Sequence, residues 1–198
     1  MNALRTPVLV LASNNPDKAE EIRAILGAAL PGLDLRPRPP DVPDIDETGA
    51  TLEENARLKA VAIAAAAGLP AVADDTGLEV AALDGAPGVF SSRFAGESAT
   101  YADNVAKLLE AMRGVADRRA RFRTVALVCW PDGREVVVEG SVDGRIATEA
   151  RGTTGFGYDP VFEPDGADGR TFAELGPDGK HKLSHRARAF RALAARLE

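Results

Sequence analysis

Two adjacent carboxylates, Asp74 and Asp75, follow a short apolar run and precede a hydroxyl and a glycine, Thr76 and Gly77. In α/β proteins, ligands gather where strands end, because the loops there are held by a rigid sheet. Such a carboxylate pair suits Mg²⁺, which takes one or two protein carboxylates together with substrate phosphates, and it suits a general base acting on water. The same residue types are also common in ordinary turns, so both interpretations stand at this point.

Polar residues also follow the first apolar segment, residues 7–12, which predicts a buried strand. Asn15 and Pro16 are typical of a helix start, as N-cap and first helical residue. The free N–H groups and the dipole at such a helix N-terminus can bind an anion. Lys18 falls in the first turn, where the dipole disfavours a cation, and a bound phosphate would explain its presence. The alternative is a solvated surface lysine.

A lysine lies on the apolar stripe of a long helix predicted from about residue 51 to residue 67. Lys59 there needs an anion or a carboxylate as partner unless its flexible stem carries the ammonium out to solvent. Asn55 lies one turn earlier, at the edge of the stripe. Glu47, just before the helix, is a candidate second metal carboxylate, or an acid that the helix dipole favours.

A glycine-rich stretch, residues 152–160, carries two aromatic residues. Its glycines allow the backbone to approach a ligand closely, and Phe156 and Tyr158 offer planar faces for a base. A turn with aromatic anchors is the alternative. The last helix is predicted to begin at Ser184, close to four potential cations: Lys180, Lys182, His185 and Arg186. Because cations are disfavoured at the positive end of a helix, this cluster predicts an anionic or electron-rich ligand.

The remaining segments complete an alternation of strands and helices. We expect a short strand at residues 33–35, irregular structure at 37–46, a continuation of the sheet at 78–83 and a helix at 99–112. Residues 131–133, Pro-Asp-Gly, predict a hairpin between residues 121–130 and 134–139, and a further strand is expected at 141–148.

Composition limits the classes of protein that remain possible. The 198 residues, 45% of them hydrophobic, suffice for a sizeable core, and the net charge of −6 argues against a surface that binds nucleic acid. Cys129 is the only cysteine, so no internal disulfide can form, and its apolar surroundings predict a buried, unreactive thiol. No secretory signal and no apolar span of 18 residues is recognised, which predicts a cytoplasmic protein without a membrane partner.

Seven motifs in order resemble the inosine/xanthosine triphosphate pyrophosphatase family, and together they span nearly the whole chain from about Val8. They are Ser13-x-Asn15-x-x-Lys18, Glu47-Thr48-Gly49 with Asn55 and Lys59, Ala73-Asp74-Asp75-Thr76-Gly77-Leu78, Gly85-Ala86-Pro87-Gly88, Ser92-Arg93-Phe94-Ala95-Gly96, Gly155-Phe156-Gly157-Tyr158-Asp159-Pro160 and Ser184-His185-Arg186. Thr76 stands where many members have Ser, and the hydroxyl is kept.

The resemblance implies a single α/β domain over residues 1–198, with a long mixed β-sheet flanked by helices and two lobes with a central cleft. It also implies a homodimer that hydrolyses ITP, dITP and XTP to the monophosphate and pyrophosphate with Mg²⁺. A purine nucleoside triphosphate is therefore the expected partner, without nucleic acid.

Residue roles follow from the same resemblance. Asp75 is implied to be the general base and a metal ligand, and Glu47 the other metal carboxylate, whereas the role of Asp74 stays open. Binding of the polyphosphate is implied for Ser13, Asn14, Asn15, Pro16, Asp17, Lys18, Lys59 and Lys180. Thr76 is implied to contact the substrate beside the metal. The base pocket is implied to comprise Phe156, Gly157, Tyr158, Asp159, His185 and Arg186.

Selection of the base is expected to rest on hydrogen bonding. A donor from Arg186 or His185 aimed at a 6-keto oxygen would face the amino group of ATP and reject it. Two other functions compete with this interpretation. The septum-inhibitor-like nucleotide pyrophosphatases act on other modified nucleotides, and a nucleotide sensor would bind without catalysis. The complete motif set argues against the first, and the presence of Asp75, Glu47 and Lys18 argues against the second.

Overall fold

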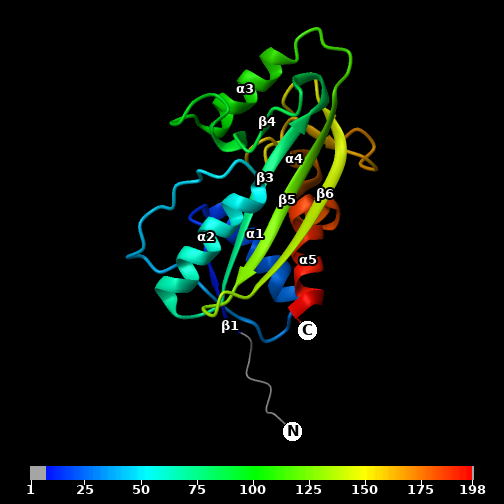
Figure 1. The fold of residues 1–198 in the computed structure, drawn as a ribbon. Helices are drawn as coiled ribbons and strands as arrows, with labels where there is room; N and C mark the ends of the chain where they lie inside the picture. The colour runs from blue at the N-terminus through cyan, green and yellow to red at the C-terminus, as the bar shows by residue number, and fades with distance from the viewer. Residues whose placement is uncertain (1–7, 198) are drawn as a thin grey trace. The chain divides into compact units, whose positions relative to one another are not determined.

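The computed structural model describes residues 8–197 of the chain, which form an α/β fold with a mixed β-sheet (Figure 1). The strand order is β2-β1-β3-β5-β6-β7, with β4 paired to β3. β1 runs parallel to β2 and β3, whereas the β3–β4 and β6–β7 pairs are antiparallel. The predicted fold class, a mixed sheet with flanking helices, is confirmed. The predicted single domain and the two lobes with a cleft stay predictions.

The elements have the following bounds. The strands are β1 Val8–Leu11, β2 Asp34–Arg36, β3 Ala71–Val80, β4 Pro87–Gly88, β5 Arg119–Cys129, β6 Glu135–Ile146 and β7 Phe162–Pro164. The α-helices are α1 Pro16–Ala29, α2 Leu52–Ala67, α3 Tyr101–Ala111, α4 Phe172–Leu183 and α5 His185–Leu197. Short 3₁₀ turns lie at Ala81–Leu83 and Ser91–Arg93. None of the helices within residues 8–197 is long and apolar enough to cross a membrane.

The chain divides into two compact units. Unit 1 contains the residues up to Asp75, residues Thr124–Gly140 and the residues from Arg186 onward. Unit 2 contains Thr76–Arg123 and Ser141–His185. The chain passes from unit 1 to unit 2 within β3, between Asp75 and Thr76. The residues predicted to do chemistry are therefore shared between the two units.

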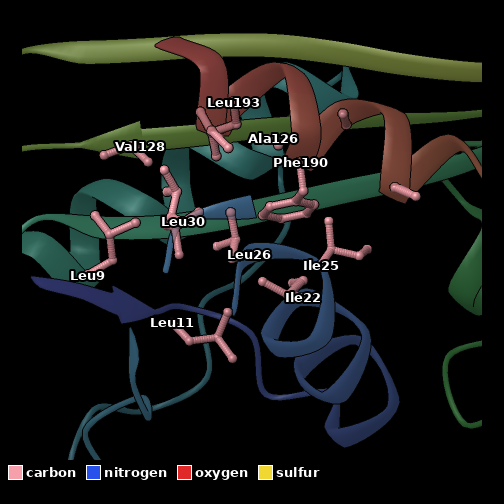
Figure 2. Packing of buried hydrophobic residues seen from close by; sticks show 14 residues of the cluster. Leu9, Leu11, Ile22, Ile25, Leu26, Leu30, Ala126, Val128, Phe190 and Leu193 are labelled. Atoms are coloured by element: carbon pink, nitrogen blue, oxygen red, sulfur yellow. The ribbon is translucent and has the colours of Figure 1, made fainter. Parts of the chain in front are cut away.

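The core of unit 1 is built where α1 and α5 cover one face of its strands (Figure 2). Residues alternate along β1, so Leu9 and Leu11 both face this core. Figure 2 shows Phe190 and Leu193 of α5 directed toward Leu26 of α1, in the same cluster. This apolar packing fixes the start of α1 and the start of α5, which carry charged residues of the site.

Helix α2 is the second support of unit 1 and follows its prediction closely. Thr51 is the N-cap, and a capping box pairs its side chain and backbone with Glu54. Gly68 ends the helix in a left-handed conformation with φ 62°. The residues of its buried face are Leu52, Asn55, Ala56, Ala60, Ile63 and Ala64. This face contains the polar Asn55 beside the apolar stripe, which already marks α2 as part of a site.

The core of unit 2 is aromatic. Phe122 contacts Phe162 edge-on with ring centroids 4.7 Å apart, and the rings of Phe162 and Phe172 are 5.3 Å apart. Helix α3 begins with a capping box between Thr100 and Asp103. It adds buried residues to this core, which also includes Leu78 and Val80 from β3. Unit 2 thus has its own packed interior, to which Tyr158 of the glycine-rich stretch belongs.

The structure corrects several predicted elements. The strand expected at residues 78–83 ends at Val80, and residues 81–83 form a 3₁₀ turn. The two strands expected at 134–139 and 141–148 are one continuous strand, β6. Strand β7 and helix α4 were not predicted. Helix α4 escapes the helical pattern because Gly176, with φ 69°, interrupts it directly before Pro177.

Candidate active site

Asp74 and Asp75 lie inside β3 rather than at its end, which corrects the expectation of a loop. Both are buried, with 2% and 4% of their surface exposed. Successive side chains of a strand point to opposite faces, so the two carboxylates meet different neighbours. Asp74 contacts Lys18 and Arg186, whereas Asp75 contacts Lys59 and Asn55. The turn-like sequence forms a strand because these partners satisfy the buried charges.

The Asp75 side of the strand gathers two carboxylates around one ammonium. Lys59 Nζ lies 2.6 Å from Glu47 Oε1 and 3.2 Å from Asp75 Oδ1. Asn55 Nδ2 donates to Asp75 Oδ2 at 3.3 Å, and Asn55 Oδ1 accepts from the Gly49 amide at 2.8 Å. A Cβ at Gly49 would lie 2.6 Å from Asn55 Oδ1, so the close approach of this loop to α2 requires glycine.

Burial and charge act in opposite directions on this group. Burial raises the pKa of Asp75 above its usual value, although the neighbouring ammonium of Lys59 works against the rise. For Lys59, burial disfavours the charged form, but the charges of Asp75 and Glu47 outweigh it and raise its pKa. Lys59 therefore stays an ammonium at neutral pH.

The Asp74 side holds a buried ion-pair network. Arg186 Nε and Nη2 donate to Asp74 Oδ2 at 3.2 and 3.1 Å, and Arg186 Nη1 donates to Glu21 Oε2 at 2.6 Å. Lys18 Nζ lies 3.6 Å from Asp74 Oδ2. Burial alone would raise the pKa of Asp74, but Lys18 and Arg186 hold it well below its usual range. Asp74 is thus a permanent anion that fixes two cations.

The start of α1 has the predicted cap. Asn15 Oδ1 accepts from the Lys18 amide at 3.1 Å, and Ser13 Oγ accepts from the Asn15 amide at 3.2 Å. Pro16 is the first residue of the helix and Asp17 follows in its first turn. The Asn14 side chain donates to Asp44. The cation that the helix dipole disfavours, Lys18, finds its counter-charge in Asp74.

In unit 2, the glycine-rich stretch is organised by Asp159. Its Oδ2 accepts from the Phe156 amide at 2.9 Å and from Lys180 Nζ at 2.6 Å. Lys180 Nζ also lies 4.4 Å from the centre of the Phe156 ring. Gly155 has φ 76°, and a Cβ there would lie 2.1 Å from Asp159 Oδ2. This group joins an aromatic face, a hydrogen-bond donor and an acceptor.

The other predicted base contacts have structural partners. His185 is buried and stacks on Phe122, with ring centroids 4.4 Å apart and an angle of 16°. The Tyr158 hydroxyl donates to the Ser91 carbonyl at 2.9 Å, and burial raises the pKa of this phenol. Gly157 lies in the turn between Phe156 and Tyr158 with φ 61°. Tyr158 thereby fixes the glycine-rich stretch to the loop that contains Ser91.

Two predicted residues belong to a different unit from the rest of the group with which they were predicted, and their roles stay predictions. Lys180, predicted to bind phosphate, lies with Phe156 and Asp159 in unit 2. Arg186, predicted to contact the base, belongs to unit 1, where its guanidinium contacts Asp74 and Glu21. The residues of unit 1 that do lie in contact are those around Asp75 and Asp74. Thr76, a half-buried residue, is the first residue of unit 2.

The structure corrects the positions of two charges that were expected at the start of α5. Lys180 and Lys182 lie in the last turn of α4, where the helix dipole favours cations, and not at the start of α5. The apparent conflict of four cations at one positive helix end therefore involves only His185 and Arg186.

Sequence reasoning missed Glu21, which stands one helical turn after Lys18 on α1. That spacing was the available signal, because residues three apart on a helix are neighbours.

Glu47 and Asp75 together have the chemistry of a magnesium site. Both offer hard carboxylate oxygens, and one cation, the Lys59 ammonium, already lies within 3.2 Å of both. Within residues 8–197, no three His, Cys, Asp or Glu side chains converge as a complete ligand set. Two carboxylates suit Mg²⁺, which completes its octahedron with water and substrate phosphates. The donor set therefore fits the predicted metal.

Comparison with known proteins identifies similar chains. The model of the Ham1 family matches residues 9–196. The dITP/XTP pyrophosphatase of Streptomyces coelicolor is 49% identical over 192 residues, which cover 93% of this chain and 94% of that protein. The dITP/XTP pyrophosphatase of Mycolicibacterium paratuberculosis is 50% identical over 195 residues, covering 96% of this chain and 95% of the relative.

Solved structures agree with this similarity. A HAM1 protein from Coxiella burnetii superposes with a TM-score of 0.87 at 43% identity, covering 96% of this chain and 98% of that chain. A nucleoside-triphosphatase, or dITP/XTP pyrophosphatase, from Mycobacterium abscessus gives a TM-score of 0.75 at 41% identity, covering 96% of this chain and all of that one. The likeness extends over nearly the full length of each chain.

Proposed function

Because this chain belongs to the Ham1 family, we propose that it hydrolyses non-canonical purine nucleoside triphosphates, dITP, ITP and XTP, to the monophosphate and pyrophosphate. The names of the similar relatives support this activity. The observation that carries it in this chain is the group formed by the buried Asp75 and the half-buried Glu47 and Lys59. Two carboxylates beside an ammonium provide metal ligands, a base and a phosphate-binding cation in one place.

The reaction assigns distinct tasks to the residues of unit 1. Asp75 orients a water molecule and accepts its proton as the water oxygen bonds to the α-phosphorus. The bond from the α-phosphorus to the bridging oxygen breaks, and pyrophosphate leaves with that oxygen. Glu47 and Asp75 would hold Mg²⁺, which would supply positive charge to neutralise the phosphates. Lys18, Lys59 and the amides at the start of α1 stabilise the charge on the leaving pyrophosphate.

The distinction between 6-keto purines and adenine is assigned to the Lys180 and Asp159 pair, whereas the rejection of GTP requires a further contact near the 2-amino group. A 6-keto purine presents an acceptor at O6 and a donor at N1, whereas adenine presents a donor and an acceptor at these positions. Supporting this role, the Lys180 ammonium is a donor 2.6 Å from the Asp159 acceptor, and both lie beside the Phe156 ring. Stacking on Phe156 would hold the base whichever purine it is. His185 and Arg186 stay predicted members of the substrate site.

A substrate panel tests the proposal. The purified protein is incubated with Mg²⁺ and, separately, ITP, dITP, XTP, ATP, GTP and dTTP, and released pyrophosphate and orthophosphate are measured. We expect pyrophosphate from the first three and little product from the others. Chelation of the metal should stop the reaction. A folded protein that turns over none of them would contradict the proposal and favour a nucleotide sensor.

The assembly and the location of the protein follow the family resemblance. We expect a homodimer in the cytoplasm, with no membrane or nucleic-acid partner. Light scattering on the purified protein measures the oligomeric state, and a mass of one chain at micromolar concentration would contradict the dimer.

A further inference from the structure

Lys59 lies where a metal ion bound by Glu47 and Asp75 would have its positive charge. Its Nζ is 2.6 Å from the first carboxylate and 3.2 Å from the second, so the ammonium bridges the two. The Lys59 side chain is only 12% exposed and belongs to α2, a helix capped at both ends. In this arrangement the protein itself balances one of the two negative charges of the pair, at the place where a metal ion would bind.

An ammonium and a divalent cation repel each other strongly at such short range. At the dielectric constant of a partly buried site, charges a few ångströms apart interact far more strongly than in water. A metal entering the pair therefore either displaces Lys59 or binds weakly beside it. The four-carbon stem of lysine is flexible, so the ammonium can move when another anion is offered.

We propose that Lys59 competes with the divalent cation for Glu47 and Asp75, and that the substrate triphosphate releases this competition by providing a new anionic partner for the ammonium. The inference rests on the proposed function for its metal pair and its substrate. It adds that metal and nucleotide bind with positive coupling. Without nucleotide, the Lys59 ammonium occupies the two carboxylates and weakens metal binding. By linkage, the factor by which nucleotide tightens metal binding equals the factor by which the metal tightens nucleotide binding.

Metal binding to the nucleotide-free protein tests the proposal directly. Mn²⁺ serves as the probe, because the electron paramagnetic resonance signal of the free ion reports how much remains unbound. We expect Lys59→Met to bind Mn²⁺ at least about tenfold more tightly than the wild type, because a positive charge is removed from the site. Lys59→Arg, which keeps the charge, and Lys107→Met, the same exchange on α3 in unit 2, should stay within about twofold of the wild type.

Two further variants show that the effect arises at this site and guard against a variant that fails to fold. The gain should vanish in the double variant Lys59→Met with Asp75→Asn, because that variant lacks one of the metal carboxylates. Lys59→Gln is measured in parallel, so that the experiment does not depend on one variant that fails to fold. Equal or weaker Mn²⁺ binding in both folded charge-removing variants would overturn the proposal.

The outcome is separable from the proposed function, since Mn²⁺ binding is measured without nucleotide or turnover. If the protein releases pyrophosphate from dITP but removal of Lys59 does not tighten Mn²⁺ binding, the proposed function is supported and this inference is contradicted. If removal of Lys59 tightens Mn²⁺ binding but the protein hydrolyses none of the nucleotides, the competition is supported and the proposed reaction is contradicted. A second readout is thermal unfolding: Mg²⁺ should raise the melting temperature of Lys59→Met more than that of the wild type.

Discussion

Asp74 and Asp75 are neighbours in the chain, but their surroundings give them opposite properties. Asp74 is locked by Arg186 and Lys18 and stays ionised, whereas the pKa of Asp75 is raised by burial. A carboxylate with a raised pKa is the better proton acceptor, and one with a lowered pKa is the better fixed counter-charge. The alternation of side chains along β3 creates this division of labour between two identical residues.

Asp75→Asn tests the reactive half of this pair. Asparagine keeps the size and the hydrogen bond to Asn55 but removes the base and a metal ligand. We expect turnover of dITP to fall by at least about 10²–10⁴-fold, the range typical for the loss of a general base. Steady-state pyrophosphate release measures it, with circular dichroism as the control for folding. A folded variant that keeps most of its activity would refute the assignment of the base.

Asp74→Asn tests the structural half. Breaking a buried ion pair by removing one partner costs about 3–5 kcal/mol, so we expect a loss of that size in the free energy of unfolding at pH 7. The folded-state pKa of Asp74 lies below its unfolded value, so the unfolded state binds more protons as the pH falls. The difference in free energy of unfolding between the wild type and the variant should therefore shrink as the pH is lowered.

Urea unfolding of the wild type and Asp74→Asn at pH 7 and pH 3 measures this effect. The unfolded-state pKa is about 3.9, so the gap between the two proteins should narrow by about 1 kcal/mol over this range. A gap that stays constant or widens would show that the charge of Asp74 contributes no stability. Asp75→Asn is the matched control. We expect it to lose much less free energy of unfolding, because burial already disfavours the charged form of Asp75.

Lys180→Met tests base selection. Methionine keeps much of the length of lysine and its contact with the Phe156 ring but removes the donor beside Asp159. The ratio of kcat/KM for ITP to that for ATP should fall by about 10-fold or more, since one buried hydrogen bond is worth about 1.5–3 kcal/mol when a charged group makes it. An unchanged ratio with a changed KM for all triphosphates would instead indicate that Lys180 binds phosphate.

At the scale of elements, α1 and α2 were predictable from the start signals in their sequences. Asn15 with Pro16, and Thr51 with Glu54, specify the first turns of α1 and α2 by local hydrogen bonds. The continuity of β3 was not predictable, because its Asp-Asp-Thr-Gly segment has turn chemistry. Its buried charges are satisfied by residues distant in sequence, such as Arg186, 112 positions away. Tertiary pairing therefore overrides local preference there.

In the glycine-rich stretch, the contact between residue 155 and Asp159 requires glycine at position 155. Gly155 combines a positive φ with the absence of any space for a Cβ beside Asp159. Gly155→Ala should displace Asp159 and Lys180 and lower the stability by about 1–3 kcal/mol. It should also reduce discrimination between ITP and ATP. The control is Gly27→Ala within α1, where the new Cβ would have no atom within 4 Å apart from its chain neighbours and the backbone of its own helix.

The control variant should behave in the opposite way. Alanine is favoured over glycine in a helix by about 0.8–1.0 kcal/mol, so Gly27→Ala should stabilise the protein or leave it unchanged. Urea unfolding compares the free energy of unfolding of both variants with the wild type. A Gly155→Ala protein as stable as Gly27→Ala, with unaltered selectivity, would contradict the role given to the contact with Asp159.

At the scale of the whole molecule, the residues that were predicted to bind substrate and metal belong to two compact units. Unit 1 carries the carboxylates, Lys59 and Lys18, and unit 2 carries Phe156, Asp159 and Lys180. The types of residue were predictable because each motif has its own chemistry. Their grouping was not, because ion-pair partners such as Glu21 with Arg186, or Asp159 with Lys180, are set by the tertiary fold. The roles predicted for Lys180 in phosphate binding and for Arg186 in the base pocket therefore stay predictions.

The position at which water attacks the triphosphate is the most direct test of the role given to Asp75. The protein hydrolyses dITP with Mg²⁺ in water enriched in ¹⁸O, and mass spectrometry locates the isotope in the products. If Asp75 activates water against the α-phosphorus, the label appears in the nucleoside monophosphate and pyrophosphate carries none. Label in pyrophosphate would mean attack at the β-phosphorus, which would contradict the mechanism assigned to Asp75 and its partners.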